Sequence, residues 1–153
     1  GSELWKSDGT EVSTVRVKDI YPGSNGSSPS NFTPVGNTLY FTAYDQNGTE
    51  LWKSDGTSAG TVRVKDIRPG SSSSSPYHLT VVGNTLFFRA NDGSSGTELW
   101  KSDGTSAGTV RVKDISPGSG SSSPYKLTLV GNKLFFRASD VEGSELWAID
   151  TSQ

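Results

Sequence analysis

Short hydrophobic runs alternate along the chain with segments rich in Gly, Ser and Asp, and the runs recur in the same order. In the middle of the chain they predict four strands, at 77–82, 85–90, 98–102 and 109–115. Gly83-Asn84 separates the first two strands and is typical of a two-residue hairpin turn, because both residues tolerate positive φ. No segment shows the periodicity of a helix, so the pattern predicts an all-β fold.

The second and third predicted strands each place two large apolar residues side by side, Phe87-Phe88 and Leu99-Trp100. Successive side chains of a strand point to opposite faces, so both faces of these strands must be covered. The fourth strand instead alternates Val with Arg or Lys, as an edge strand with one wet face does. The pattern predicts a sheet with buried inner strands and an amphipathic outer strand.

The tripeptide Glu-Leu-Trp occurs four times, with Trp at positions 5, 52, 100 and 147, at intervals of 47, 48 and 47 residues. We interpret 1–153 as a single repeat domain with copies at approximately 1–47, 48–95 and 96–142 and a closing strand at 143–153. Residues 48–67 are identical to 96–115, including positions expected on the surface. Such identity indicates recent duplication or design.

The strand pattern of each copy predicts one four-stranded antiparallel blade of a β-propeller, with three blades per chain. The alternative is a β-trefoil, which also has three units of four strands in about this length. In the propeller, the apolar residues of the central strands form the core between blades. The residues expected there are Trp5, Trp52, Trp100, Trp147, Leu51, Leu99, Phe88 and Phe136.

The segment Glu-Leu-Trp-Lys-Ser-Asp-Gly-Thr-Ser-Ala-Gly-Thr, continuing to Val-Lys-Asp-Ile-x-Pro-Gly, resembles the bacterial repeat family named for its ELWxxDGT motif. The resemblance covers essentially the whole chain and implies propeller-like blades, with no catalytic role shared by such repeats. The sequence departs from the motif at Glu11-Val12-Ser13 in the first copy and at Ala148-Ile149-Asp150 in the last.

With the strands of a copy lettered A to D, the chain reads CD, ABCD, ABCD, ABC, so it begins and stops within blades. Three blades leave two apolar faces open, because propellers close with about four to eight blades or more. We therefore expect the chain to be its own partner, as a homodimer with six blades or, next, a trimer with nine. One C strand is then redundant, and we expect it to be 3–7, displaced or disordered.

Charge and composition exclude several classes of partner. The net charge is −2 and the basic residues alternate with acids, so neither nucleic acid nor an anionic membrane is expected to bind. No stretch approaches the about 20 apolar residues of a membrane span. The chain contains no Cys, which leaves its compartment undetermined; an extracellular or cell-surface place in a bacterial parent is consistent with the family resemblance.

No catalytic or cofactor site is predicted, and the protein is not expected to be an enzyme. The single His has no counterpart in the other copies, and no nucleophile elbow, phosphate-binding loop or His cluster occurs. Asp45, Asp92 and Asp140 are each followed by a Glu in the loop between strands B and C. They are weak candidates for Ca²⁺, but the spacing does not match an EF-hand loop, so no metal site is predicted.

The loops between D and A and between B and C are expected to share one surface, with Tyr77, His78, Tyr125 and Lys126 at the ends of Ser-rich tracts. Aromatic rings and hydroxyls together suit a carbohydrate. Differences between copies on this surface are mild, however. The predicted function is a structural or self-assembling scaffold, engineered or amplified from a repeat, and the alternative is a module that binds carbohydrate or protein through this surface.

Overall fold

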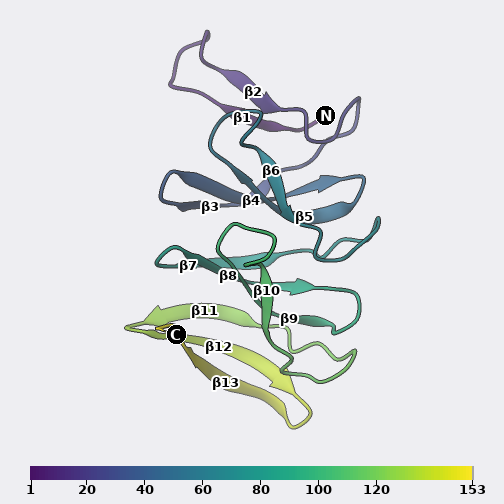
Figure 1. Ribbon diagram of the computed structural model, residues 1–153, viewed down its shortest axis with the longest axis vertical. Coiled ribbons are helices and arrows are strands. Elements are labelled where there is room, and N and C mark those ends of the chain that lie inside the picture. Colours follow the sequence, from purple (N-terminus) through teal and green to yellow (C-terminus); the bar gives the residue numbers. More distant parts are fainter. Residues whose placement is uncertain (153) are drawn as a thin grey trace.

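The computed structural model describes residues 1–152, which form thirteen strands and no helix. Figure 1 shows four sheets that follow one another along the long axis, with the two termini at opposite ends of the stack. The strands are β1 (Leu4–Lys6), β2 (Val15–Lys18), β3 (Ser30–Val35), β4 (Thr38–Asp45), β5 (Gly48–Ser54), β6 (Val62–Lys65), β7 (Tyr77–Val82), β8 (Thr85–Asn91), β9 (Thr97–Ser102), β10 (Val110–Lys113), β11 (Tyr125–Val130), β12 (Lys133–Asp140) and β13 (Gly143–Asp150).

Each sheet is an antiparallel meander in which sequence neighbours pair. The orders are β1-β2, β3-β4-β5-β6, β7-β8-β9-β10 and β11-β12-β13. The four strands predicted in the middle copy are thereby confirmed, with Val82 paired to Thr85 across the predicted two-residue turn. None of the sheets within 1–152 closes into a barrel, which contradicts the β-trefoil alternative.

The first strand of each later sheet starts with an irregularity. The register of β7 against β8 shifts between Tyr77 and Thr80, and His78 within this segment has a φ of 56°. Ser75, just before the strand, has a φ of 49°. Positive φ values of this kind, in the left-handed region of backbone conformation, are uncommon for residues other than Gly. The surrounding structure must therefore hold Ser75 and His78 in this conformation.

Three apolar clusters fill the spaces between successive sheets. Phe88 packs in the cluster between the second and third sheets, whereas its neighbour Phe87 packs in the cluster between the third and fourth. The prediction that this strand is covered on both faces is confirmed. Six of the eight residues expected in this core are at most 7% exposed: Leu51, Trp52, Phe88, Leu99, Trp100 and Phe136.

The two tryptophans nearest the ends of the stack differ from the middle two. Trp147 is half-buried and packs against the third cluster. Trp5 is 58% exposed, so its expected place in the core is wrong for the chain by itself. Its equivalents Trp52 and Trp100 are buried because the preceding sheet covers them, whereas within 1–152 no sheet lies against Trp5 on that side.

Buried and exposed side chains alternate less regularly along the outer strands than predicted. In β6, Val64 is 4% exposed whereas Val62 is 36% exposed, although both should point to the same face. In β10, Val110 is 37% exposed, and the register against β9 shifts between Arg111 and Lys113. A bulge of this kind interrupts the two-residue period, so only one Val of each outer strand enters the core.

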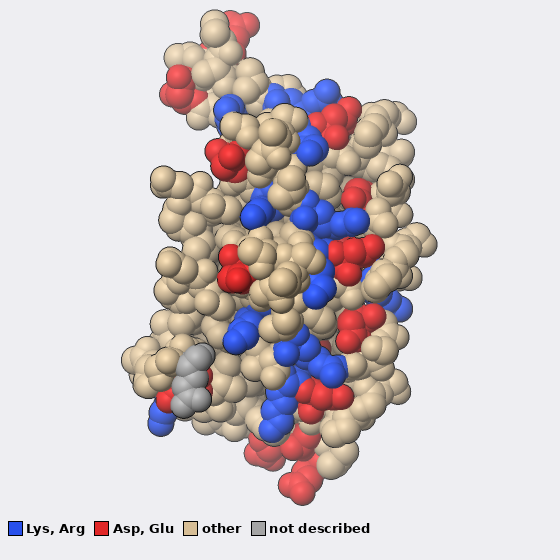
Figure 2. All heavy atoms as spheres, viewed as in Figure 1, with Lys and Arg blue, Asp and Glu red and all other residues tan. Residues whose placement is uncertain are grey.

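Lysines link the first sheet to the second and the second to the third. Lys6 Nζ donates to the Gly56 carbonyl at 2.8 Å, and Lys53 Nζ donates to the Gly104 carbonyl at the same distance. A second series joins Lys18 to the Thr61 carbonyl and Lys65 to the Thr109 carbonyl, at 2.7 and 2.8 Å. Figure 2 shows Lys and Arg gathered in a column along the face where β2, β6 and β10 lie. No helix within 1–152 is long and apolar enough to cross a membrane.

Candidate functional site

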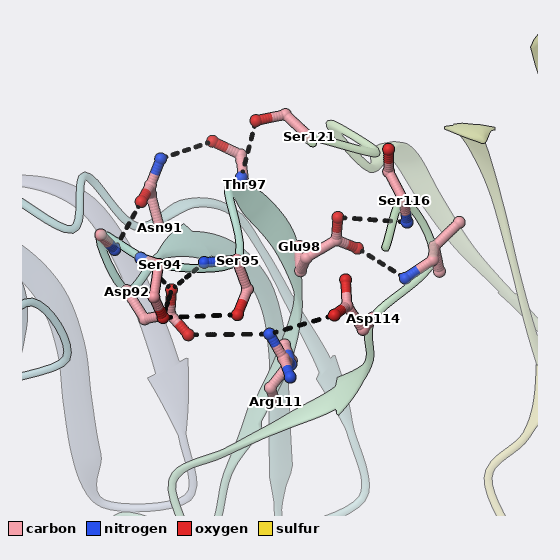
Figure 3. A network of polar contacts seen from close by, with 12 residues as sticks. Asn91, Asp92, Ser94, Ser95, Thr97, Glu98, Arg111, Asp114, Ser116 and Ser121 are labelled. Carbon is pink, nitrogen blue, oxygen red and sulfur yellow. Dashed lines mark hydrogen bonds and ion pairs between the residues drawn. The ribbon is translucent and has the colours of Figure 1, made fainter. Parts of the chain in front are cut away.

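A buried glutamate holds the loop that joins each sheet to the next. Glu98 on β9 is completely buried, and its carboxylate accepts hydrogen bonds from the backbone N–H of Ile115 (3.0 Å), Ser116 (3.4 Å) and Ser122 (3.0 Å) and from the Ser122 hydroxyl (2.6 Å). Figure 3 shows its carboxylate turned toward the segment that contains Ser116. Glu3 and Glu50 occupy the same position in their sheets and make the corresponding bonds.

Burial raises the pKa of the Glu50 carboxyl, and the hydrogen bonds from Ser74 and Ile67 oppose that rise. A buried carboxylate with several donors is stable as a structural element, because backbone N–H groups replace its hydration. These glutamates therefore anchor the loops and are not available to a ligand.

The weak metal candidates are engaged by other groups. Asp45 lies 3.3 Å from Arg63 and Asp92 lies 3.7 Å from Arg111, while Asp140 accepts a hydrogen bond from the Glu142 N–H at 2.8 Å. Figure 3 shows Arg111 between Asp92 and Asp114. Within 1–152 no group of three or more His, Asp and Glu side chains is placed to hold a metal ion. The Glu that follows each Asp therefore does not complete a metal site.

The predicted binding-face residues come together on β7 and β11, the first strands of adjacent sheets. The ring of His78 lies edge-on to both tyrosines, with centroids 4.5 Å from Tyr77 and 4.7 Å from Tyr125. The Lys126 ammonium lies 5.7 Å from the Tyr125 ring centroid. Burial, and then the charge of Arg89, lower the pKa of His78.

Three neighbouring cavities surround Arg89 on β8. One of about 300 Å³ includes Tyr77 and Asn31, and another of about 300 Å³ includes Tyr125 and Arg137. The third, of about 230 Å³, includes Arg68 and a set of hydroxyl side chains. Arg89 lines all three, so it is the common element of this surface.

Sequence reasoning did not single out Arg68, Arg89 or Arg137. The signal that was available is the difference between copies, since the position of Arg89 is Thr in the first copy and Arg in the other two, and that of Arg68 is Tyr, Arg and Ser. No protein-family model matches the chain, and no curated protein matches it significantly.

The Asp-Gly-Thr turns between the third and fourth strands respond to pH. Hydrogen bonds from the Thr57 hydroxyl (2.7 Å) and N–H (2.8 Å) lower the pKa of Asp55, and Thr105 does the same for Asp103. Because the folded pKa is depressed, this contribution to stability is present above the usual value of 3.8 and is lost as the pH falls through the folded pKa.

We therefore expect the urea midpoint to fall below about pH 3.8, and to fall less in the Asp55→Asn/Asp103→Asn double variant, whose amide oxygens accept the same bonds at any pH. Urea titrations at neutral and acidic pH check this. Equal falls in both proteins would contradict the assignment.

Proposed function

We propose that this protein is a self-assembling scaffold of the β-propeller class, an engineered or amplified repeat whose sheets serve as blades. The first strands of adjacent sheets contact one another, β3 with β7 and β7 with β11. Sheets that meet along their first strands and carry amphipathic outer strands are typical of blades around an axis. When the 153-residue chain is by itself, a second copy supplies the remaining blades of the ring.

The observation that carries this proposal is the apolar surface left open at both ends of the stack. At one end, Trp5 is 58% exposed and Phe32 is 54% exposed; at the other, Leu146 is 75% exposed. The equivalents of Trp5 and Leu146 in the middle of the stack, Trp52 and Leu99, are 7% and 0% exposed. Apolar surface of this extent is stabilised by association.

The lysine links identify the contacts that a second copy would make. Lys6 and Lys53 donate to turn carbonyls of the next sheet, but Lys101, at the same position in the third sheet, has no turn ahead of it, because the fourth sheet lacks an outer strand. In the ring, Lys101 donates to the carbonyl of Gly9 in a second copy. Lys113 likewise donates to the Thr14 carbonyl, continuing the series of Lys18 and Lys65.

Two strands compete for the third position of the shared blade, β13 of one copy and β1 of the other. The expectation that residues 3–7 are displaced or disordered concerns the ring. In the single chain Glu3 anchors its loop, Lys6 bonds to Gly56 and Ser7 bonds to Thr14 at 2.8 Å, and these contacts favour keeping β1. In β13 the positions of Lys6 and Ser7 are taken by Ala148 and Ile149, which cannot form these bonds. The proposed ring therefore keeps β1 and releases β13.

Light scattering coupled to size-exclusion chromatography tests the assembly. We expect a single species of twice the chain mass of 16.2 kDa, which gives six blades, or next of three times that mass, which gives nine. A monodisperse species of 16.2 kDa at all concentrations would overturn the proposal.

Trp5→Ala tests whether β1 or β13 is the third strand of the shared blade. Trp5 is exposed in the single chain and becomes buried only if β1 enters that blade. We expect this variant to be folded by circular dichroism but monomeric. The control is Leu146→Ala in β13, which is expected to assemble like the wild type. The opposite pattern, with Trp5→Ala assembled and Leu146→Ala monomeric, would show that β13 is retained.

A further inference from the structure

The six arginines of the chain fall into two groups. Three of them, on the outer strands, lie near an aspartate, in the pairs Arg16–Asp19 (3.6 Å), Arg63–Asp45 (3.3 Å) and Arg111–Asp92 (3.7 Å). The other three, Arg68, Arg89 and Arg137, form no ion pair with any residue in 1–152. These unpaired guanidinium groups are the ones that line the cavities around Arg89.

The two cavities that contain pairs of these arginines are chemically alike. Arg68 and Arg89 line the cavity of about 230 Å³, and Arg89 and Arg137 line one of about 300 Å³. Ser123 belongs to both, and the other polar groups of their walls are hydroxyls and one amide. No described Asp or Glu lines either cavity. Positive charge and hydrogen-bond donors are therefore concentrated without a counter-charge.

The N–H groups of the Arg89 guanidinium form no hydrogen bond with residues 1–152. The residue is half-buried, and its guanidinium lies 5.3 Å from the ring centroid of Tyr77. Arg137 uses only its Nε, which donates to the Ser144 hydroxyl at 2.7 Å. Because a guanidinium stays charged at all relevant pH values and these donors are left to water, a bound anion would replace water contacts by charge-assisted hydrogen bonds.

The backbone beside these cavities is strained at repeated positions. Ser75 and Ser123 have φ of 49° and 48°, and both line cavities that contain Arg89. His78 and Lys126, three residues further on in each copy, have φ of 56° and 54°. Bulges and left-handed residues of this kind commonly aim side chains and backbone groups at a ligand.

Two of the differences between the second and third copies lie in the smaller cavity. The second and third copies are identical over 48–67 and 96–115, which form the third and fourth strands and their turn. They differ at Arg68 and Asn91, which both line the smaller cavity and are Ser116 and Ser139 in the third copy. The corresponding positions of the third copy therefore carry a hydroxyl in place of the guanidinium and the amide.

We propose that the cavities around Arg89 bind an oxyanion, the carboxylate, sulfate or phosphate group of a ligand no larger than a monosaccharide. In each of the two cavities that contain two arginines, these bind the oxygens with charge-assisted hydrogen bonds, and the hydroxyl side chains complete the shell. In the cavity that contains Arg137, Tyr125 offers an apolar ring face beside the oxyanion. The volumes lie at or below the lower end of the about 300–1,000 Å³ found for small-molecule sites, which limits the ligand's size. This activity is separate from assembly into a ring, since Arg68 and Arg89 belong to one chain.

The single histidine of the sequence, His78, can be used to detect anion binding at Arg89. The charge of Arg89 contributes to the low pKa of His78, so an anion held by Arg89 raises that pKa. The experiment follows the imidazole resonances of His78 by NMR during titration with sodium sulfate, sodium glucuronate and glucose, at constant ionic strength set with chloride. We expect saturable shifts and a raised His78 pKa with sulfate and glucuronate, and none with glucose.

The variant Arg89→Gln is expected to weaken binding at least about tenfold, because it removes charge-assisted hydrogen bonds. The matched control is Arg16→Gln, which removes the same charge from an outer strand and is expected to bind like the wild type. Thermal melting of both variants establishes that they are folded. Isothermal calorimetry with the same anions gives a second readout.

Tighter binding of glucuronate than of sulfate would identify an acidic sugar as the ligand class, and equal binding would identify a general oxyanion site. The proposal is overturned if neither anion gives a saturable shift, if glucose binds as well as glucuronate, or if Arg16→Gln weakens binding as much as Arg89→Gln. The chain mass, measured in the same samples, shows separately whether the ring forms.

Discussion

Replacing Phe87 by Ala is expected to lower the free energy of unfolding by about 3–5 kcal/mol. Phe87 is 5% exposed and packs between the third and fourth sheets against Leu99, Ile115 and Leu134. Truncation removes the apolar contacts on both sheets and leaves a cavity, because the paired strands on either side cannot collapse into it. Urea unfolding followed by tryptophan fluorescence measures the loss.

Phe135 provides the matched control, since it occupies the same position in the next copy but has no sheet beyond it. Its side chain is half-buried, so Phe135→Ala in the monomer is expected to cost only about 1 kcal/mol. If the two variants lose equal stability in the monomer, burial between sheets is not the source of the stability of Phe87. In the assembled ring the cost at Phe135 should rise toward that at Phe87.

Glu98→Ala is expected to destabilise the protein by about 3 kcal/mol, although it replaces a charged residue by an apolar one. The change leaves the backbone N–H groups of Ile115 and Ser122 and the Ser122 hydroxyl without their acceptor inside the protein. It also frees the loop 116–124 that leads to β11. Urea unfolding gives the loss, and amide hydrogen exchange of Ser122 shows whether the loop is released.

The repeat supplies a control for this variant as well. Glu145 is at the same position in β13 but is exposed, because the outer strand and the loop that would engage it are absent from its sheet. Glu145→Ala is therefore expected to change stability by less than about 0.5 kcal/mol. A large effect at Glu145, or a negligible one at Glu98, would contradict the anchoring role.

The strands were predictable from the sequence because each is bounded by a turn with a distinct composition. Gly83-Asn84 and the Asp-Gly-Thr turns fix where strands end, and the pairs Phe87-Phe88 and Leu99-Trp100 identify the strands covered on both faces. Local patterns of this kind depend on a few adjacent residues. They therefore predict the strands regardless of how the rest of the chain folds.

Burial depends on neighbours that a single repeat does not specify. Trp5 and Trp100 lie in the same motif, yet one is 58% exposed and the other 7%, because only one has a preceding sheet against it. This difference between identical motifs is set by what lies beside each sheet. The bulge of the outer strands is instead shared by the copies, with Val15, Val62 and Val110 at 39%, 36% and 37% exposed, so it belongs to the repeat although simple alternation does not predict it.

The cavities around Arg89 were beyond sequence reasoning for a related reason. Arg68, Arg89 and Arg137 are separated by 21 and 48 residues, and Arg89 shares one cavity with Arg68 and another with Arg137 only because adjacent sheets lie side by side. The aromatic residues Tyr77 and Tyr125 were recognised from their place beside the Ser-rich tracts. The arginines were not, since Arg89 and Arg137 look like ordinary polar positions of a strand and Arg68 like one of a loop.

The lysine links join the first sheet to the second and the second to the third, and the apolar clusters pack each sheet only against its immediate neighbours, so the stack behaves as a one-dimensional chain of coupled units. In such a chain the end units have one neighbour and open most easily, whereas the middle units open only after an end has been lost. The same coupling makes the molecule extensible: an inserted copy of 48 residues would repeat an interface that already exists twice, and each addition would raise the cooperativity of the whole without changing the local structure.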